Sequence, residues 1–149
     1  MSVSAYLEVK LSHPQIKKMS SVELIQRLLN QGWALNYDGE VSYLPLGDND
    51  EFAWRAESIS SESLLAILNE KEQRGELVGV VLTWKDSGIG GDFLVYNDGT
   101  LSVSLSINRK LIEDVESGIT DLNWYLVKLL PVFSGDGLQV ESFSYEEHL

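Results

Sequence analysis

Apolar and polar residues alternate at the start of the chain, over residues 5–11. A period of two is typical of a strand with one buried face. Apolar residues then recur at helical spacing over 22–29, after Ser20 and Glu23 in the arrangement of a capping box and before a glycine stop at Gly32. We therefore expect a strand followed by an amphipathic helix.

The next segment has the pattern of a hairpin. Two apolar-rich runs, 33–37 and 41–46, flank the dipeptide at 38–39, and Asp-Gly between such runs is a strong short-range hairpin signal. The acidic stretch 47–51 indicates a loop. We expect the run 52–59, in which large apolar side chains alternate, to be extended.

A second amphipathic helix is expected over 60–75, because leucine and isoleucine again recur at helical spacing. The apolar run 77–84 is typical of a central strand. The runs 93–96 and 101–107 surround an Asn-Asp-Gly sequence at 97–99, which indicates a second hairpin.

The last third of the chain carries weaker signals. We expect a short helix over 109–117 and then a helix that is capped by Thr120 or Asp121 and ended by Pro131. A final strand is expected over 138–145.

This order of elements predicts the α+β fold class. Tight turns join antiparallel neighbours, so we expect a mainly antiparallel sheet with about three helices packed on one face. Residues 1–149 form one globular domain in this interpretation, with a C-terminal tail frayed from about 146. The segment 20–30 resembles 60–69, which makes a duplicated βαββ unit one interpretation of the chain.

Charge narrows the range of partners. The chain of 149 residues has 11 Lys and Arg against 23 Asp and Glu, a formal net charge of −12. A negative field repels phosphate, which disfavours nucleic acid and anionic membranes, and it attracts basic proteins. The chain has no cysteine for disulfides or thiolate metal sites, and no apolar run of membrane-spanning length. We therefore expect a cytoplasmic protein.

The sequence offers little that would support catalysis or metal binding. The two histidines, His13 and His148, are not placed as bases oriented by a buried carboxylate. The acids from Asp48 onward begin like a calcium loop, but Ala53 replaces the required glycine and Ile59 the required glutamate. We therefore expect a protein that is not an enzyme and that uses no cofactor and no metal.

Acidic residues lie beside large aromatic residues at two places. One is the acidic loop, and the other is a glycine-rich stretch over 87–91, which leads into a strand and lacks the spacing of a phosphate-binding loop. Carboxylates can pair with Lys and Arg of a partner while aromatic rings supply buried anchors. The candidate partner-binding residues are Asp48, Asp50, Glu51, Trp54, Asp86 and Asp92.

If the first three of these acids form a surface, replacing Asp48, Asp50 and Glu51 by amides is expected to leave the thermal midpoint nearly unchanged. The acidity belongs to the body of the chain, because the first 30 residues hold four Lys and Arg against two Glu. The expected partner is a cognate protein with a basic surface.

In overall character the chain resembles the immunity proteins of bacterial polymorphic-toxin and contact-dependent growth inhibition systems. The resemblance rests on an acidic, cysteine-free single domain without a catalytic set, and no diagnostic motif supports it. It implies stoichiometric binding and neutralisation of a cognate toxin, often a basic nuclease. Two alternatives remain open: a small carboxylate-dependent hydrolase, and an acidic nucleic-acid mimic or adaptor that occupies DNA-binding proteins.

Overall fold

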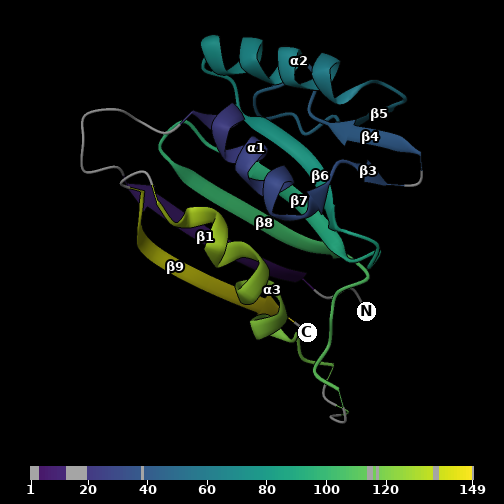
Figure 1. The fold of residues 1–149 in the computed structure, drawn as a ribbon, viewed down its shortest axis with the longest axis vertical. Coiled ribbons are helices and arrows are strands. Elements are labelled where there is room, and N and C mark those ends of the chain that lie inside the picture. The colour runs from purple at the N-terminus through teal and green to yellow at the C-terminus, as the bar shows by residue number, and fades with distance from the viewer. Residues whose placement is uncertain are drawn as a thin grey trace.

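A computed structural model describes residues 4–12, 20–37, 39–113, 116, 118–135 and 138–148. Its strands form one antiparallel sheet in the order β3-β4-β6-β7-β8-β1-β9, with β2 added to β6 and β5 to β4 (Figure 1). The elements in chain order are β1 (Ser4–Ser12), α1 (Ser21–Gln31), β2 (Trp33–Ala34), β3 (Asn36–Tyr37), β4 (Glu40–Tyr43), β5 (Arg55–Glu57), α2 (Ser61–Gln73), β6 (Val78–Trp84), β7 (Gly90–Val95), β8 (Thr100–Ile107), α3 (Leu122–Leu129), the 3-10 helix η1 (Leu130–Phe133) and β9 (Gln139–His148).

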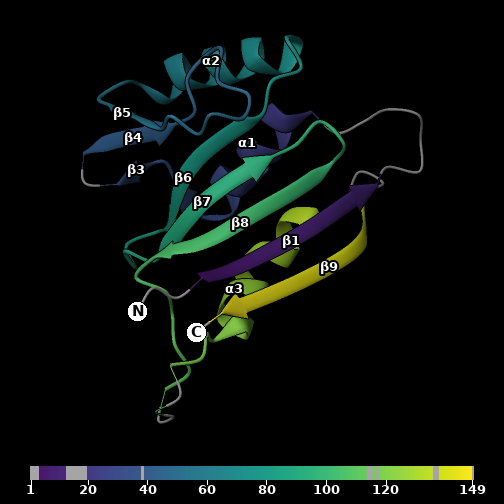
Figure 2. The ribbon, with the colours of Figure 1, turned by 180° about the vertical axis from the view of Figure 1, so that it is seen from behind.

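The helices leave one face of the sheet uncovered. Helices α1 and α3 lie over the same face, and α2 lies beside α1 at the β4 end (Figure 1). From behind, β7, β8, β1 and β9 stand in front of the helices with no helix covering them (Figure 2). All three helices contribute apolar side chains to one buried core. The expected α+β class, an antiparallel sheet with three helices, is confirmed.

The period of two along the central strands follows from this arrangement. In β8, Leu101, Val103 and Leu105 are buried under the helices, whereas the serines between them lie on the opposite face. In β1, Leu7 and Val9 are buried and their neighbours are exposed. We call the uncovered side of β6, β7, β8, β1 and β9 the open face.

Several turns and helix caps lie where local sequence patterns predict them. Tyr37 pairs with Glu40, which confirms the first hairpin, although residue 38 lies outside the described residues. The side chain of Ser20 caps α1 by accepting from the amide of Glu23. Glu72 in α2 also contributes to the N-terminal cap of α1. Its carboxylate accepts hydrogen bonds from the amide of Ser21 and from the hydroxyl of Ser20, the latter at 2.8 Å.

Two expectations for the C-terminal part are wrong. The described residues of 109–117 contain no helix; instead Leu111 forms an isolated bridge with Thr120. The tail expected to fray from about 146 is part of β9, which continues to His148 and pairs with β1 along its length. The strands between α1 and α2 have two to four residues, whereas β6, β7 and β8, which follow α2, have six to eight, so the two halves of the suspected duplication are unequal.

Two glycines at the start of β7 are required by the close approach of neighbouring strands. A Cβ atom on Gly90 would lie 1.9 Å from the carbonyl oxygen of Leu82, and one on Gly91 would lie 1.8 Å from that of Ser104. The pairing of β7 with β8 shifts register at this point, between Gly90 and Asp92. A side chain at either glycine would therefore force the backbone of the sheet to move.

We expect Gly91→Ala to lower the free energy of unfolding by about 2 to 3 kcal/mol, because the methyl group overlaps backbone that cannot relax locally. Ser102→Ala, which adds no bulk on the open face, should change it by less than about 0.5 kcal/mol. Chemical denaturation of both variants measures the difference. Equal effects would contradict the close strand contact.

Candidate functional site

Asp48 holds the acidic loop together from within. Its side chain is 5% exposed, and its carboxylate accepts hydrogen bonds from three backbone amides, those of Glu51 at 3.0 Å, Phe52 at 3.1 Å and Ala53 at 2.7 Å. A buried carboxylate with its lone pairs used in this way cannot meet a partner. The expectation that Asp48 belongs to an electrostatic surface is therefore wrong.

A fully buried lysine supports the same loop from below. The ammonium group of Lys71 in α2 donates to the carbonyl oxygens of Pro45 at 2.8 Å and Asp48 at 2.6 Å. It also lies 3.3 Å from the carboxylate of Glu76, which in turn accepts from the amide of Gly47 at 2.8 Å. A buried cation is tolerated only when its donors are matched, so these contacts fix the path of the loop.

The loop presents carboxylates and apolar side chains in fixed positions. Asp50 and Glu51 are exposed, Phe52 is 45% exposed, and Leu46 is 39% exposed. Phe52 has a φ of 55°, a left-handed conformation that is uncommon for a bulky residue and costs free energy. Trp54 is only half-buried. We call the surface formed by Leu46, Asp50, Glu51 and Phe52 the loop knob.

A hollow lies between the acidic loop and the β7–β8 turn. Its volume is ≈ 390 Å³, and its lining residues are Asn49, Gly75, Leu77, Tyr96, Asn97 and Asp98. Side-chain amides hold its walls together: Asn97 donates to the carbonyl of Gly75 at 2.6 Å, and Asn49 accepts from the amide of Leu77 at 2.9 Å. The hollow thus joins three segments that are far apart in sequence.

A second hollow continues onto the open face. It measures ≈ 220 Å³, shares Tyr96 and Asp98 with the first, and is otherwise lined by Glu8, Thr100 and Ser102. We call the two adjoining hollows the acidic groove. Hydrogen bonds from the side chain of Thr100 and from its amide, the latter at 3.0 Å, lower the pKa of Asp98. Asp98 is therefore ionised at neutral pH and suited to pairing with a cation.

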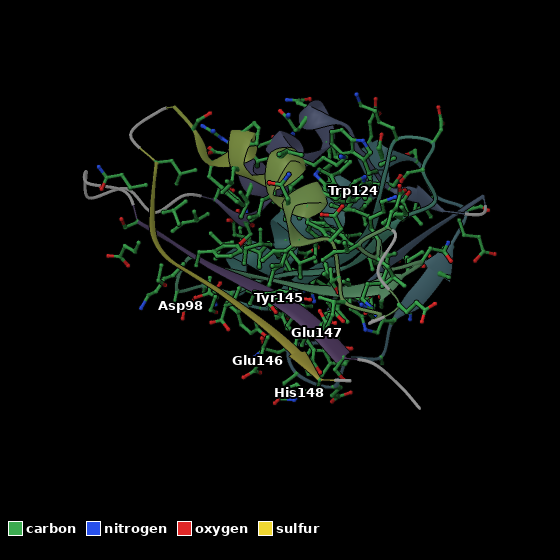
Figure 3. The ribbon with its side chains drawn as sticks, turned by 90° about the horizontal axis from the view of Figure 1, so that it is seen from below. Asp98, Trp124, Tyr145, Glu146, Glu147 and His148 are labelled. Carbon is green, nitrogen blue, oxygen red and sulfur yellow. The ribbon has the colours of Figure 1, made fainter. Side chains whose placement is uncertain are left out.

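The strand register arranges polar residues in rows across the open face. One row runs through Asp92, Ser104, Tyr6 and Glu146, because each is the direct partner of the next. Asp98, Glu146 and His148 lie on this side, opposite Trp124 on the helix side (Figure 3). The open face therefore carries carboxylates and tyrosine among small hydroxyl side chains.

The structure separates the second predicted pair of acids. Asp86 is exposed in the β6–β7 turn, whereas Asp92 lies in β7 on the open face and is half-buried. Burial raises the pKa of Asp92, although a hydrogen bond with Ser106 partly opposes this. Asp86 and Asp92 therefore flank the glycine stretch from different structural elements, and their part in partner binding stays a prediction.

Tryptophan and lysine side chains form a cluster on the helix side that the sequence does not reveal. The ammonium group of Lys128 lies 4.0 Å from the ring centroid of Trp124 and 5.6 Å from that of Trp84. Lys85 lies 4.8 Å from the Trp84 ring. Trp84 also packs edge-on against Trp33, at 5.3 Å between centroids. Trp84 is therefore part of this cluster rather than an anchor beside the predicted acids.

The C-terminal residues of β9 belong to a further polar cluster. The carboxylate of Glu147 lies 3.4 Å from Arg109, which donates to the Thr120 hydroxyl at 2.6 Å. The hydroxyl of Tyr145 donates to the same carboxylate. Burial opposes ionisation of Glu147, but hydrogen bonds from Tyr145 and Thr120 and the charge of Arg109 outweigh it and lower the pKa of Glu147. The cluster ties the 109–120 segment to the strand.

Chemically, the groove and knob suit recognition of cations over a broad surface. Carboxylates from β1, the β7–β8 turn and the acidic loop are spread along it, and tyrosine and phenylalanine rings lie between them. Within the part of the chain that the structure describes, no group of three His, Asp or Glu side chains is arranged to hold a metal ion.

We predict that replacing two nearby acids of the loop changes the free energy of unfolding by different amounts. Asp48→Asn should lower the free energy of unfolding by about 1 to 3 kcal/mol, because the amide nitrogen that replaces one carboxylate oxygen cannot accept a hydrogen bond from the backbone. Asp50→Asn makes the same chemical change on the surface and should stay within about 0.5 kcal/mol. Thermal and urea unfolding provide the comparison, and a neutral Asp48→Asn would refute the role given to this carboxylate.

We also predict opposite effects of pH at two carboxylates of the open face. Because the folded-state pKa of Asp92 is raised, its ionisation destabilises the fold, so Asp92→Asn should stabilise the protein at pH 7. This gain should disappear as the pH falls through the folded-state pKa to below the ordinary value of 3.8.

For Asp98, whose pKa is lowered, Asp98→Asn should destabilise the protein at pH 7. That loss should fade as the pH falls from the ordinary value of 3.8 through the lower folded-state pKa. Urea unfolding of both variants as a function of pH tests the pair, and effects of the same sign would contradict the assignment.

Comparison with known proteins identifies no relative of this chain. No family model matches it, and no curated protein or solved structure matches it either. Among the described residues, no helix combines the length and apolar character that crossing a membrane requires. The geometry of the groove and knob is therefore the basis for a functional proposal.

Proposed function

We propose that this protein binds and neutralises a basic partner protein through the loop knob and the acidic groove. The observation that carries the proposal is the fixed geometry of the knob. Buried Lys71 and Asp48 hold the loop from beneath, and Phe52 is exposed directly after the exposed acids Asp50 and Glu51. A rigid aromatic anchor flanked by carboxylates is an economical way to bind a cationic surface, because little entropy is lost on association.

The charge of the whole chain supports the same proposal. A formal charge of −12 steers a cationic partner toward the protein, and the groove offers ionised Asp98 and nearby Glu8 where that partner would settle. Tyr96 contributes to both hollows and supplies a second aromatic contact. In this proposal the partner-binding set changes from that expected: Asp50 and Glu51 stay, while Asp48 acts only by shaping the loop.

The biological form of the proposal is an immunity protein in the bacterial cytoplasm. It would bind a cognate toxin domain in a stoichiometric complex and thereby cover a surface that the toxin needs for activity. This form rests on overall character, because the protein combines strong acidity with a structured binding surface. A basic nuclease domain is the toxin class that best fits the sign of the field.

The test is co-expression with a basic toxin domain encoded immediately upstream of the gene for this protein. We expect the two to co-purify and the cells to be protected. The variant Asp50→Lys/Glu51→Lys should slow association by about tenfold or more and flatten its dependence on salt. Phe52→Ala should mainly raise the dissociation rate, as expected for a buried anchor.

The matched control is Glu40→Lys/Asp86→Lys, which makes the same change in net charge at exposed acids outside the groove and knob. It should retain most of the association rate that the knob variant loses. If both double variants lose the same amount, the effect is one of net charge alone and the knob is not the interface. Failure of every adjacent basic toxin to bind at low salt would overturn the proposed function.

The carboxylate-dependent hydrolase remains a second candidate, because Glu8 and Asp98 line the same hollow. Such an enzyme needs one carboxyl group with a raised pKa to act as proton donor, whereas that of Asp98 is lowered. Hydrolysis of any glycoside or ester substrate that is abolished by Glu8→Gln would favour the enzyme. Binding of several unrelated basic proteins with similar affinity would instead favour a nucleic-acid mimic.

A further inference from the structure

Strand β9 ends the sheet and leaves a long edge unpaired. It has ten residues and pairs with β1 on one side only. No backbone hydrogen bond within the described chain reaches its other side. Figures 1 and 2 place it at the margin of the sheet, with no strand beyond it. Alternate amides and carbonyls of β9 are therefore available to another strand.

The apolar layer under the helices is also incomplete at this edge. Val140 pairs with Leu11 and Phe143 with Val9, so both side chains lie on the core side of the sheet. Val9 is 1% exposed and Leu11 7%, whereas Val140 is 39% exposed and Phe143 37%. A further strand with apolar residues on this side would cover surface that the sheet now leaves in water.

The opposite side of the same edge is polar and mostly negative. Ser142, Ser144 and Glu146 lie on the open face of β9, and Glu8 of β1 pairs directly with Ser144. Lys10 of β1 is a positively charged residue on this side, and it pairs with Ser142. Glu146 also lies 3.4 Å from His148. Basic side chains of an added strand would therefore be favoured toward the Glu146 end rather than beside Lys10.

We propose that the free edge of β9 binds an extended segment of the partner that alternates apolar residues with Lys or Arg. The apolar residues would cover Val140 and Phe143, the basic residues would face Glu146 and Glu8, and the backbone would extend the sheet. A second copy of this chain fits worse, because it would bring another net charge of −12 and a second Glu146 to the interface. The inference rests on the proposed function only for the cationic nature of the partner.

A synthetic peptide tests the edge without any toxin. The probe is a peptide of the same ten-residue length as β9 that alternates lysine with valine. One control has the same composition with the lysines in a block, and another carries N-methyl groups on alternate amides that face β9. We expect each control to bind at least about tenfold more weakly at low salt, because the strand pattern or its backbone hydrogen bonds are lost.

Residue-level amide exchange locates the binding site. In the free protein the outward amides of β9 should exchange quickly, and the peptide should protect these amides in particular. Glu146→Lys should weaken peptide binding, whereas Glu40→Lys, with the same charge change at the other end of the sheet, should have little effect. Protection elsewhere, equal binding of the blocked or methylated peptides, or equal effects of the two variants would overturn the proposal.

The outcomes also separate this inference from the proposed function. A dimer of the free protein held by β9, detected by sedimentation and lost on Glu146→Pro, would identify a second copy as the occupant and overturn the proposal. Peptide binding at β9 without neutralisation of any toxin would contradict the proposed function alone. If the protein neutralises a toxin but does not bind the peptide, only the proposal for the β9 edge is contradicted.

Discussion

The structure depends on covering a large antiparallel sheet from one side only. Helices α1 and α3 bury the apolar residues of one face, and the hydrophobic effect makes that face the core. The other face stays uncovered by helices, so many of the alternate strand residues there are polar or small. The serines of β8, and Glu8 and Lys10 of β1, occupy these positions. An uncovered face with free polar side chains is thus a direct consequence of how the core forms.

The acidic loop obtains its shape from a buried charge rather than from its own sequence. Lys71 is 0% exposed, and leaving its ammonium group without partners in that position would cost several kcal/mol. The carbonyls of Pro45 and Asp48 satisfy it, and Asp48 in turn binds three amides of the following residues. This chain of contacts is why Phe52 can be held in a left-handed conformation while its ring faces solvent.

Two lysines of the helix side and one carboxylate of the open face differ in what surrounds them. Lysines beside Trp84 and Trp124 cover the rings on the helix side, where cation–π contact accounts for their positions. On the open face, Asp92 keeps a carboxylate where burial disfavours its ionised form. The groove, the knob and the β9 edge all lie outside the lysine–tryptophan cluster.

The sequence by itself determined the elements whose signals are local. The alternation over 5–11 and the hairpin signal at 38–39 depend on neighbours a few residues apart. The strand is present, and the described residues on either side of the hairpin signal pair as predicted. The same is true of the α+β class, because tight turns between strands impose antiparallel pairing. Residue type and local spacing are sufficient for such features because the backbone has few allowed conformations.

Only the tertiary structure decided what each acid does. Asp48 and Asp50 look equivalent in the sequence, yet one is buried beneath the loop and the other is exposed. The Asp48 carboxylate accepts from the amides of the next turn, and Lys71, 23 residues away in the chain, binds its backbone carbonyl. The sequence predicts that Glu147 belongs to a frayed tail. In the structure its strand pairs with β1, and its carboxylate lies beside Arg109. Burial and ion pairing arise from long-range packing, and the local spacing of residues carries no record of which distant segments will meet.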